Sequence, residues 1–501
     1  MVDVILINPL APPEGRSFVD STNYPIGLLC LGTMLEKNGY RVEIVDGFVD
    51  KDYEEKIIKT IQNGVIYAGI SVMTAQIAVG IYISQIIRRI NHTTPIVWGG
   101  IHVTLLPEQA LSDPLCDIVV IGEGDYTCVE LAEALKYNKD LSQIKGIGYK
   151  KNGKMEFTSR REIVDIEDLP PINYNLVDIE KYTFMDFDKK YGLFGKNEEM
   201  RRMTFHTARG CPYRCTFCIN PLIYPEKRKY RAKSPQSVLD EIEFNVKKYT
   251  LNFISFGDDL FFANKKRAEV IVEELIKRRV NVKWYANVKA DYFRPDYLNE
   301  SFLKKLKAAG CIRFSIGAES GSERMHGILK KGITPRHIIN SADLVKNHRI
   351  LIGYSFMTGI PGETKEDMAE TLKIMLKLKE INPFIYFIGP QLFRPYPGSE
   401  LYLKCVEGGF KNPESLREWG RIPKTFDGAN DIRFSNWVSN PDFVEYVGLF
   451  VLINFNIDFE LQSIAKRFIY KILRLAMRLR AEFDFWFFFH LELIIVRLIR
   501  I

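Results

Sequence analysis

Short apolar runs alternate with helical patterns along the first third of the chain. The apolar runs cover residues 2–8, 41–46, 65–72, 95–100 and 117–125. Between them, apolar residues recur at helical spacing over residues 25–37, about 52–63, 76–90 and 126–137. Continuous apolar strands separated by helices favour a parallel sheet that is covered on both faces. We therefore predict an α/β fold that begins with a Rossmann-like domain over residues 1–137.

Glycines follow the ends of several of these predicted strands. They include Gly99, Gly100, Gly122 and Gly124. Open α/β sheets bind ligands at the carboxyl ends of their strands, where a glycine lets a ligand approach the backbone closely. His102 lies at the same edge, either as a ligand contact or as an ordinary loop histidine. The pattern Gly-x-Gly-x-x-Gly is absent after the first strand, which argues against a nicotinamide cofactor.

Residues 138–200 have the pattern of a linker to a second domain. They contain a predicted hairpin with Asn152-Gly153 at its turn and a stretch with two adjacent prolines, Pro170-Pro171. A connection that wraps between two α/β domains is the simplest account of this pattern.

Three closely spaced cysteines give the strongest chemical signal in the chain. Cys211, Cys215 and Cys218 form the spacing C-x3-C-x2-C on a loop after a predicted strand. A structural zinc site needs a fourth ligand, and no fourth cysteine is near. An iron–sulfur cluster held by three cysteines keeps one iron open for a substrate or cofactor. The spacing therefore favours an iron–sulfur cluster over zinc.

With Phe217 before its last cysteine, this segment resembles that of the radical S-adenosylmethionine (SAM) enzymes. The resemblance implies a [4Fe–4S] cluster whose open iron chelates the amino and carboxylate groups of SAM. It also implies that an electron from the cluster cleaves a carbon–sulfur bond of SAM and yields a 5′-deoxyadenosyl radical.

The middle of the chain has the strand spacing of the barrel that this resemblance implies. Strand candidates follow the cysteines at 252–259, 282–291, 311–320, 350–363 and 384–393, with helical patterns between them. With the strand before Cys211 they make six βα units. We expect a partial (β/α)6 radical SAM barrel over residues 201–400, with its functional residues at the strand carboxyl ends.

The same resemblance implies which residues contact SAM. Asp258 and Asp259 stand where many members carry a Gly-Gly-Glu motif, although here the acid is shifted and shortened. The remaining candidates are Ser315 and Glu319 for the ribose and carboxylate, and Gly359 and Pro361 for the adenine. Each of these residues could instead have a purely structural role, as part of a turn or as a solvated charge.

The N-terminal domain extends the resemblance to the cobalamin-binding subgroup of radical SAM enzymes. The matching segments are Gly-Gly-x-His and Gly-Glu-Gly-Asp, which imply cobalamin contacts at Gly99, Gly100, His102, Gly122, Glu123 and Gly124. The motif Asp-x-His-x-x-Gly, which supplies the lower cobalt ligand in other cobalamin proteins, is absent. Some relatives keep the domain without binding cobalamin.

Composition and charge limit the remaining alternatives. A chain of 501 residues with 46% hydrophobic residues can bury a sizeable core. Its eight cysteines are too few for a disulfide scaffold, and Cys30, Cys116 and Cys128 fit small core positions. No window of 18 uncharged apolar residues is present, so we expect no spanning helix and a reducing cytoplasmic compartment.

The last 101 residues, 401–501, are expected to form a helical, basic C-terminal region. Residues 461–501 contain eight basic and three acidic side chains, so they carry +5 of the net charge of +7. Arg467, Lys471, Arg474 and Arg478 fall on one face of a helix. This segment is either a cap packed on the barrel or an amphipathic helix at a membrane surface, and the two are compatible.

We predict cobalamin-dependent methylation of an unactivated carbon on a hydrophobic, lipid or isoprenoid-like substrate. The alternatives are a radical cyclase or carbon–carbon coupling enzyme without methyl transfer, and a cobalamin- or redox-binding sensor without catalysis. The resemblance also implies an electron donor of the flavodoxin or ferredoxin type. The charge distribution does not favour a nucleic-acid partner.

Overall fold

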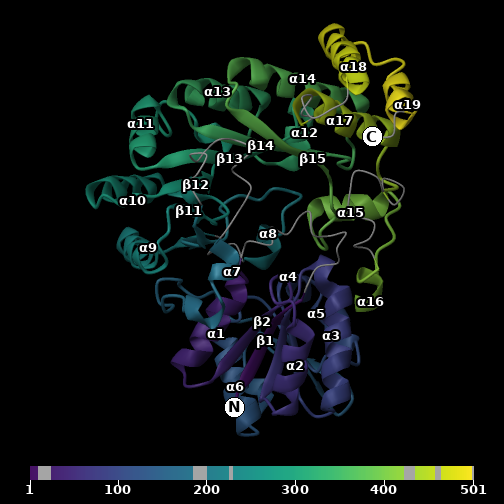
Figure 1. Ribbon diagram of the computed structural model, residues 1–501. Coiled ribbons are helices and arrows are strands. Elements are labelled where there is room, and N and C mark those ends of the chain that lie inside the picture. Colours follow the sequence, from purple (N-terminus) through teal and green to yellow (C-terminus); the bar gives the residue numbers. More distant parts are fainter. Residues whose placement is uncertain (10–23, 184–199, 225–229, 422–434, 457–463, 499–501) are drawn as a thin grey trace.

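The computed structural model describes residues 1–9, 24–183, 200–224, 230–421, 435–456 and 464–498, and the statements below concern these residues. They form two sheet-based domains stacked on each other and a helical C-terminal region (Figure 1). Parts of the predicted linker (184–199) and of the basic tail (461–463 and 499–501) lie outside the described residues.

The N-terminal sheet has the strand order β2-β1-β3-β4-β5-β6-β7. Its strands are β1 (Val4–Asn8), β2 (Val42–Asp46), β3 (Tyr67–Ser71), β4 (Ile96–Gly99), β5 (Ile118–Val120), β6 (Ile147–Lys151) and β7 (Lys154–Phe157). The first five strands pair in parallel, as the continuous apolar runs predict. Helices join them: α1 (Ile26–Lys37), α2 (Tyr53–Gln62), α3 (Ile77–Ile90), α4 (Ile101–Leu105), α5 (Pro107–Ser112) and α6 (Thr127–Lys136).

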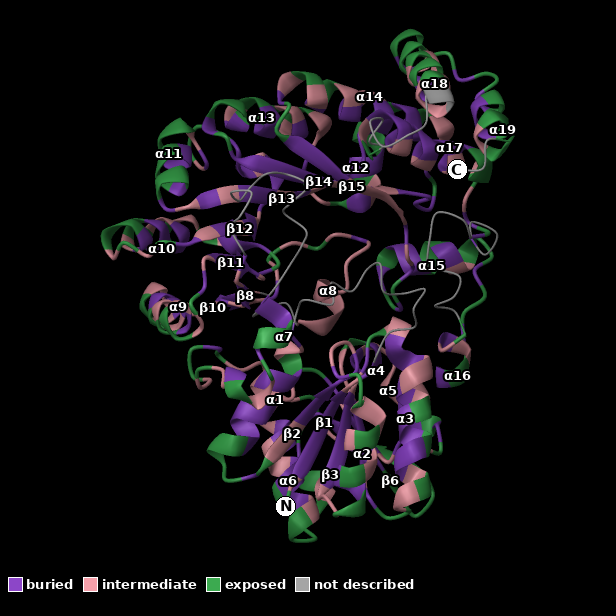
Figure 2. Ribbon diagram, in the orientation of Figure 1, coloured by how far each residue is buried: buried purple, intermediate pink, exposed green. Residues whose placement is uncertain are grey.

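Side chains alternate between the two faces along each strand, and helices cover both faces, so this sheet contributes to two cores. Val4 and Leu6 of β1 belong to the core beneath α1 and α6. Ile5 and Ile7, which point the opposite way, belong to the core beneath α2 and α3. The strands of both domains are accordingly buried and the outer helix faces exposed (Figure 2).

The hairpin that the sequence pattern placed in the linker belongs instead to the N-terminal sheet. β6 pairs antiparallel with β5, and β7 pairs antiparallel with β6. Ile147 and Tyr149 of β6 are buried, so they complete the core at this edge. The hairpin thereby pairs the backbone groups that β5 would leave open at an edge.

The second sheet has six parallel strands in the order β15-β14-β13-β12-β11-β8. They are β8 (Arg202–Phe205), β11 (Phe253–Phe256), β12 (Lys283–Asn287), β13 (Cys311–Glu319), β14 (Leu351–Thr358) and β15 (Ile385–Leu392). The helices between them are α9 (Pro235–Tyr249), α10 (Lys265–Lys277), α11 (Glu300–Ala308), α12 (Glu323–Leu329), α13 (Pro335–Val345) and α14 (Lys365–Ile381). Because neighbours in the sequence are neighbours in the sheet, this is the predicted open barrel of six βα units.

The C-terminal region is helical, as predicted. Its helices are α15 (Glu400–Glu407), α16 (Leu416–Trp419), α17 (Pro441–Val451), α18 (Ile464–Phe483) and α19 (His490–Leu498). α16 reaches back to the N-terminal domain, where the Trp419 indole donates to Gln109 Oε1 at 2.9 Å and Arg417 pairs with Asp113 at 3.0 Å. In the described part of the chain, none of the helices combines the length and apolarity needed to span a membrane.

Candidate functional site

A cavity of about 620 Å³ lies between the N-terminal domain and the barrel. Its N-terminal wall includes Ser71, Gly99, Gly100, Gly122, Glu123, Gly124 and Asp125, which lie at or after the carboxyl ends of β3, β4 and β5. Its barrel wall includes His206, Arg209, Cys218, Asn220 and Asp259. Open α/β sheets bind ligands at this edge. The cavity therefore joins the two regions that the sequence singled out.

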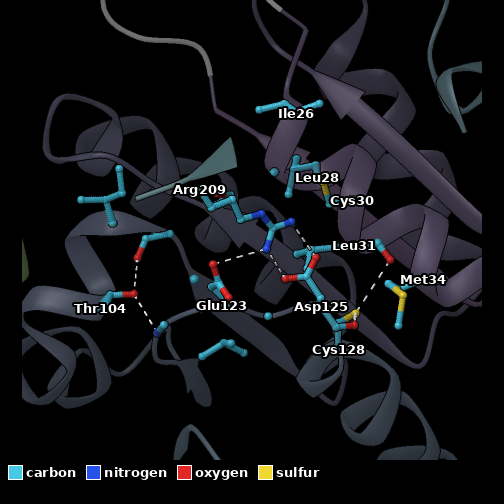
Figure 3. A pocket seen from close by; sticks show the side chains of 18 of the residues that line it. Ile26, Leu28, Cys30, Leu31, Met34, Thr104, Glu123, Asp125, Cys128 and Arg209 are labelled. Carbon is cyan, nitrogen blue, oxygen red and sulfur yellow. Dashed lines mark hydrogen bonds and ion pairs between the residues drawn. The ribbon is translucent and has the colours of Figure 1, made fainter. Parts of the chain in front are cut away.

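The cavity also extends along one face of the N-terminal sheet toward α1 and α6. Its apolar lining there includes Leu6, Leu28, Leu31, Met34, Tyr67 and Leu131. Figure 3 shows Leu28, Cys30, Leu31 and Met34 together, with Asp125 beside Leu31 and Glu123 farther away. A large ligand with a polar head and an apolar or extended part fits such a lining.

The glycines leave backbone exposed to this space. Gly100 has φ +94°, and a Cβ there would lie 2.7 Å from the carbonyl oxygen of Val72. Gly122 has φ +87°, and a Cβ there would meet no atom within 4 Å. A side chain at position 100 would therefore be unfavourable both for the backbone conformation and for the contact with Val72. At position 122 the absence of a side chain keeps space open at the cavity.

His102 is not brought into the cavity with these glycines. Its side chain is fully buried, its Nδ1 lies 3.1 Å from Thr74 Oγ1, and its ring packs edge-on against Trp419 at 5.3 Å. Burial lowers the pKa of His102 to about 4, so the ring is neutral near pH 7. Helix α4 begins directly after Gly100 and turns this side chain toward the core. The geometry does not support the expected cobalamin contact.

Two arginines of the barrel pair with the acidic loop after β5. Arg209 donates to both carboxylate oxygens of Asp125, at 2.8 and 3.0 Å, and Arg231 pairs with Glu123 at 2.7 Å (Figure 3 shows the Arg209 pairs). Although burial opposes it, the bonds to Asp125 raise the pKa of Arg209 above its usual value. Arg209 precedes Cys211 by two residues, so these pairs connect the N-terminal domain to the cysteine loop.

The cysteine loop is held by hydrogen bonds from other parts of the barrel. Thr216 donates its N–H to the carbonyl of Leu329 at 3.1 Å and its hydroxyl to the carbonyl of Ile328 at 2.9 Å, both in α12. Cys211, Cys215 and Cys218 are half-buried. Burial raises the pKa of all three thiols, that of Cys215 to about 11, while the charge of Lys331 lowers it.

The three thiols form a donor set for a cluster rather than for a single ion. Among the described residues, no three His, Cys, Asp or Glu side chains converge on one ion-sized point. A [4Fe–4S] cube bonds each thiolate to a different iron, so its ligands need not converge in that way. Cys218 lines the cavity, so a cluster held by the three thiols would lie at the cavity wall.

The two adjacent aspartates have different environments. Asp258 is buried and accepts hydrogen bonds from the Thr207 hydroxyl at 2.6 Å and the Ala208 N–H at 2.9 Å. Burial raises the pKa of Asp258 to about 6. Asp259 lines the cavity and accepts from Asn220 Nδ2 at 3.0 Å. Asp258 therefore fixes the chain that leads to the cysteines, and Asp259 alone of the pair faces the cavity.

The other residues expected at SAM lie outside the cavity lining, Ser315 in the middle of β13, Glu319 at its carboxyl end, and Gly359 and Pro361 directly after β14. Glu319, with φ +62°, pairs with Lys331, whose Nζ lies 5.9 Å from the centre of the Phe217 ring. Ser315 is half-buried on the same strand. Gly359 and Pro361 form a turn that Glu363 caps: its Oε2 accepts from the Gly359 N–H at 2.6 Å.

Sequence reasoning missed several residues of the cavity, among them Cys128, which is buried as expected but also lines this space. Cys30, expected in the core, is half-buried and lines the cavity, because this side of α1 faces the open space. His206 lines it from the end of β8, and burial lowers its pKa to about 4. Arg209 was not singled out, although its place two residues before the first cysteine was a usable signal. Cys116 and Cys128 are buried, as predicted.

Comparisons with known proteins match both halves of this arrangement. Residues 205–375 match the radical SAM superfamily and residues 18–132 match the B12 binding domain. The chain is 31% identical to an uncharacterized methyltransferase of Pyrococcus horikoshii, over 84% of this chain and 87% of that protein. It is 27% identical to an anaerobic magnesium-protoporphyrin IX monomethyl ester cyclase of Rubrivivax gelatinosus, over 75% of this chain and 65% of the relative.

The fold is similar to that of a solved structure. A radical SAM methyltransferase from Kitasatospora setae, TsrM, with cobalamin and a [4Fe–4S] cluster bound, superposes with a TM-score of 0.63. The match has 20% sequence identity and covers 84% of this chain and 81% of that one. At this identity the likeness supports the fold, and the chemistry must be argued from the residues.

Proposed function

Because this chain belongs to the radical SAM enzymes that carry a B12-binding domain, we propose that it transfers a methyl group to an unactivated carbon of a hydrophobic substrate. The cofactors of such an enzyme are a [4Fe–4S] cluster, SAM and cobalamin. When bound, they supply a 5′-deoxyadenosyl radical and a transferable methyl group.

The observation that carries the proposal is the shared cavity. It brings the glycine edge of the N-terminal sheet and Cys218 of the cysteine loop to one space. Hydrogen abstraction and methyl transfer must act on the same substrate carbon, so the groups that perform them must meet at one place. A cavity that both regions line supports the proposal that they do.

The residues present fit these cofactors. Cys211, Cys215 and Cys218 would hold the cluster and leave one iron for SAM. The open backbone at Gly122 and the apolar space along α1 fit a large corrin cofactor. We assign Asp259, Ser315 and Glu319 to the SAM side and Gly99, Gly100 and Gly124 to the cobalamin side.

The chain's own groups prepare the site for radical chemistry. Arg209 and Asp125 neutralise each other at the domain boundary, so no unpaired charge of this pair faces a radical. His206 is neutral near pH 7 because burial lowers its pKa, so it adds no charge to the cavity wall.

The apolar lining also supports a hydrophobic substrate. We place the enzyme in a reducing cytoplasm with an electron donor of the flavodoxin or ferredoxin type, and residues 461–501 would bring it to a membrane where such substrates are found. The likeness to a cyclase supports a second candidate, ring closure without methyl transfer.

The test is anaerobic purification with cobalamin supplied, followed by iron, sulfide and cobalt analysis and addition of SAM and a reductant. Cluster and cobalt, with 5′-deoxyadenosine and S-adenosylhomocysteine formed, support methyl transfer. 5′-Deoxyadenosine without S-adenosylhomocysteine supports the cyclase, and cofactor binding without SAM cleavage supports a sensor.

A matched cysteine control sharpens this test. Cys215→Ser should lose the cluster absorbance and all 5′-deoxyadenosine. Cys30→Ser replaces a thiol that is also half-buried and that lines the cavity with Cys218, and it should keep both. Equal loss in the two variants would contradict the assignment of the cysteines.

A further inference from the structure

Helix α18 is apolar on two opposite sides. Tyr470, Leu473, Met477 and Ala481 are buried against the protein. Phe468, Ile472, Leu475, Leu479 and Phe483 are exposed, with Leu475 61% and Phe468 66% accessible. At 3.6 residues per turn the second row lies opposite the first. A helix that is apolar on both sides needs a second surface to cover it.

The exposed row continues into the turn and helix that follow. Phe485, Phe487 and Phe488 are exposed and lie together, with ring centres 5.8 and 6.4 Å from that of Phe485. On α19 the exposed apolar residues are Leu491, Ile494, Ile495 and Leu498. We call these residues, together with the exposed row of α18, the outer apolar face. Figure 2 shows α18 and α19 at the periphery of the molecule.

Such a concentration of exposed apolar side chains marks an interaction surface. Elsewhere among the described residues, exposed phenylalanines are scattered singly, as Phe244 on α9 and Phe384 before β15 are. Phe485, Phe487 and Phe488 cannot all be explained as incidental exposure, because they are consecutive or nearly so. Among the described residues, this clustering of exposed phenylalanines is therefore specific to the C-terminal segment.

The charges around this face identify its partner. Lys471 and Arg478 are exposed on the basic row, which lies between the buried row and the exposed row of α18. Two of the three acidic residues of the segment are neutralised by ion pairs: Asp484, whose side chain is 65% exposed, pairs with Lys373 of α14 at 2.8 Å, and Glu492 is buried against Arg480. The outward charge is therefore mainly positive.

We propose that the outer apolar face docks on an anionic lipid membrane and inserts its aromatic side chains among the headgroups. Apolar side chains flanked by Lys and Arg are the pattern by which a helix lies in a membrane interface. A second copy of this chain is a poorer partner, because a twofold interface would bring the two basic rows together. This inference extends the proposed function by giving the hydrophobic substrate a source.

The test is flotation of the full-length holoenzyme with lipid vesicles. One set contains phosphatidylglycerol mixed with phosphatidylcholine, and the other contains phosphatidylcholine alone. We expect the enzyme to float with the anionic vesicles and to be released by added salt. Phe487→Ser combined with Phe488→Ser should lower the partition coefficient by about tenfold, the factor that corresponds to about 1.4 kcal/mol.

Matched variants separate docking from other effects. Phe244→Ser changes a phenylalanine that is 64% exposed on α9, and it should leave flotation unchanged. Lys471→Glu should weaken binding to anionic vesicles, whereas Lys304→Glu, on the exposed side of α11, should not. Unchanged 5′-deoxyadenosine formation in solution shows that each variant is folded.

Three outcomes would overturn the inference. The first is a wild-type enzyme that stays in the soluble fraction with anionic vesicles. The second is equal flotation of the Phe487/Phe488 variant. The third is a wild-type dimer that the same variant converts to a monomer, which would assign the face to a second copy. None of them bears on methyl transfer, which is measured separately.

Discussion

The two glycines Gly100 and Gly122 allow a matched test of what the cavity edge requires. Both have positive φ, and both line the cavity. We consider Gly100→Ala and Gly122→Ala, which add the same methyl group at two positions of one domain. The restriction of the unfolded chain by alanine is the same in both and cancels in the comparison.

The structure gives different costs for the two substitutions. At Gly122 only the backbone conformation is unfavourable, at about 1–2 kcal/mol, since a Cβ would meet no atom within 4 Å. At Gly100 the backbone (φ +94°, ψ −175°) lies in a region used essentially by glycine, at about 1–3 kcal/mol.

Gly100→Ala also creates a steric clash. The new Cβ would lie 2.7 Å from Val72 O and 2.8 Å from Val72 N. The Val72 N–H donates to the carbonyl of Gly99 at 3.0 Å and the Val72 carbonyl accepts from the His102 N–H at 3.3 Å, so moving this residue weakens two hydrogen bonds of about 1 kcal/mol each. The total cost is about 3–5 kcal/mol.

The assay is urea denaturation followed by tryptophan fluorescence, since Trp98 lies on β4 next to this edge. Gly100→Ala should lower the free energy of unfolding by about 2 kcal/mol more than Gly122→Ala does. Gly122→Ala should stay folded and bind cobalamin more weakly, because its methyl group occupies cavity space. Equal stability losses, or unchanged cobalamin affinity in Gly122→Ala, would refute the reasoning.

Three further predictions concern buried charges. Burial raises the pKa of Glu363 from 4.5 to about 8, so between these pH values the folded chain keeps a proton that the unfolded chain has lost, and stability falls as pH rises through this window. Glu363→Gln should remove that dependence in thermal denaturation scans from pH 4.5 to pH 8; an unchanged slope would contradict it. Asp125→Asn leaves Arg209 without its bidentate partner and should lower the free energy of unfolding by about 3 kcal/mol. In a double-mutant cycle, Arg209→Met combined with Asp125→Asn should lower it by less than the sum of the two single changes. Asp258→Asn should lower the melting temperature and the iron content, because Asp258 fixes the backbone at Thr207 and Ala208. Asp259→Asn should leave both unchanged and raise the SAM concentration needed for half-maximal 5′-deoxyadenosine formation. The reverse pattern would exchange their roles.

Local patterns in the sequence determined the element types and the cluster ligands. The N-terminal strands could be predicted because both faces of their sheet are buried, which requires continuous apolar runs. The three cysteines could be predicted as cluster ligands because their spacing within eight residues is enough to define a chelating loop. Both signals depend on residues that are close in the sequence.

Side-chain environment was decided only by the tertiary structure. Asp258 and Asp259 are neighbours in the chain, yet one is buried beneath the backbone at Thr207 and the other faces the cavity. His102 follows the glycine edge by two residues, but the start of α4 turns it toward Trp419, which lies more than 300 residues later in the sequence. The pairing of Arg209 with Asp125 likewise depends on how the two domains pack.

Helix α18 likewise shows which features the sequence determines and which the packing determines. The sequence determined that α18 is helical, basic and amphipathic, and the basic residues were its most evident row. Which row is covered depends on the elements that pack against α18, and α14 and the helical turn Leu452–Asn456 cover the row from Tyr470 to Ala481. The row from Phe468 to Phe483 is thereby left outside. Helical periodicity fixes which residues share a side, but only packing against distant elements decides which side meets the solvent.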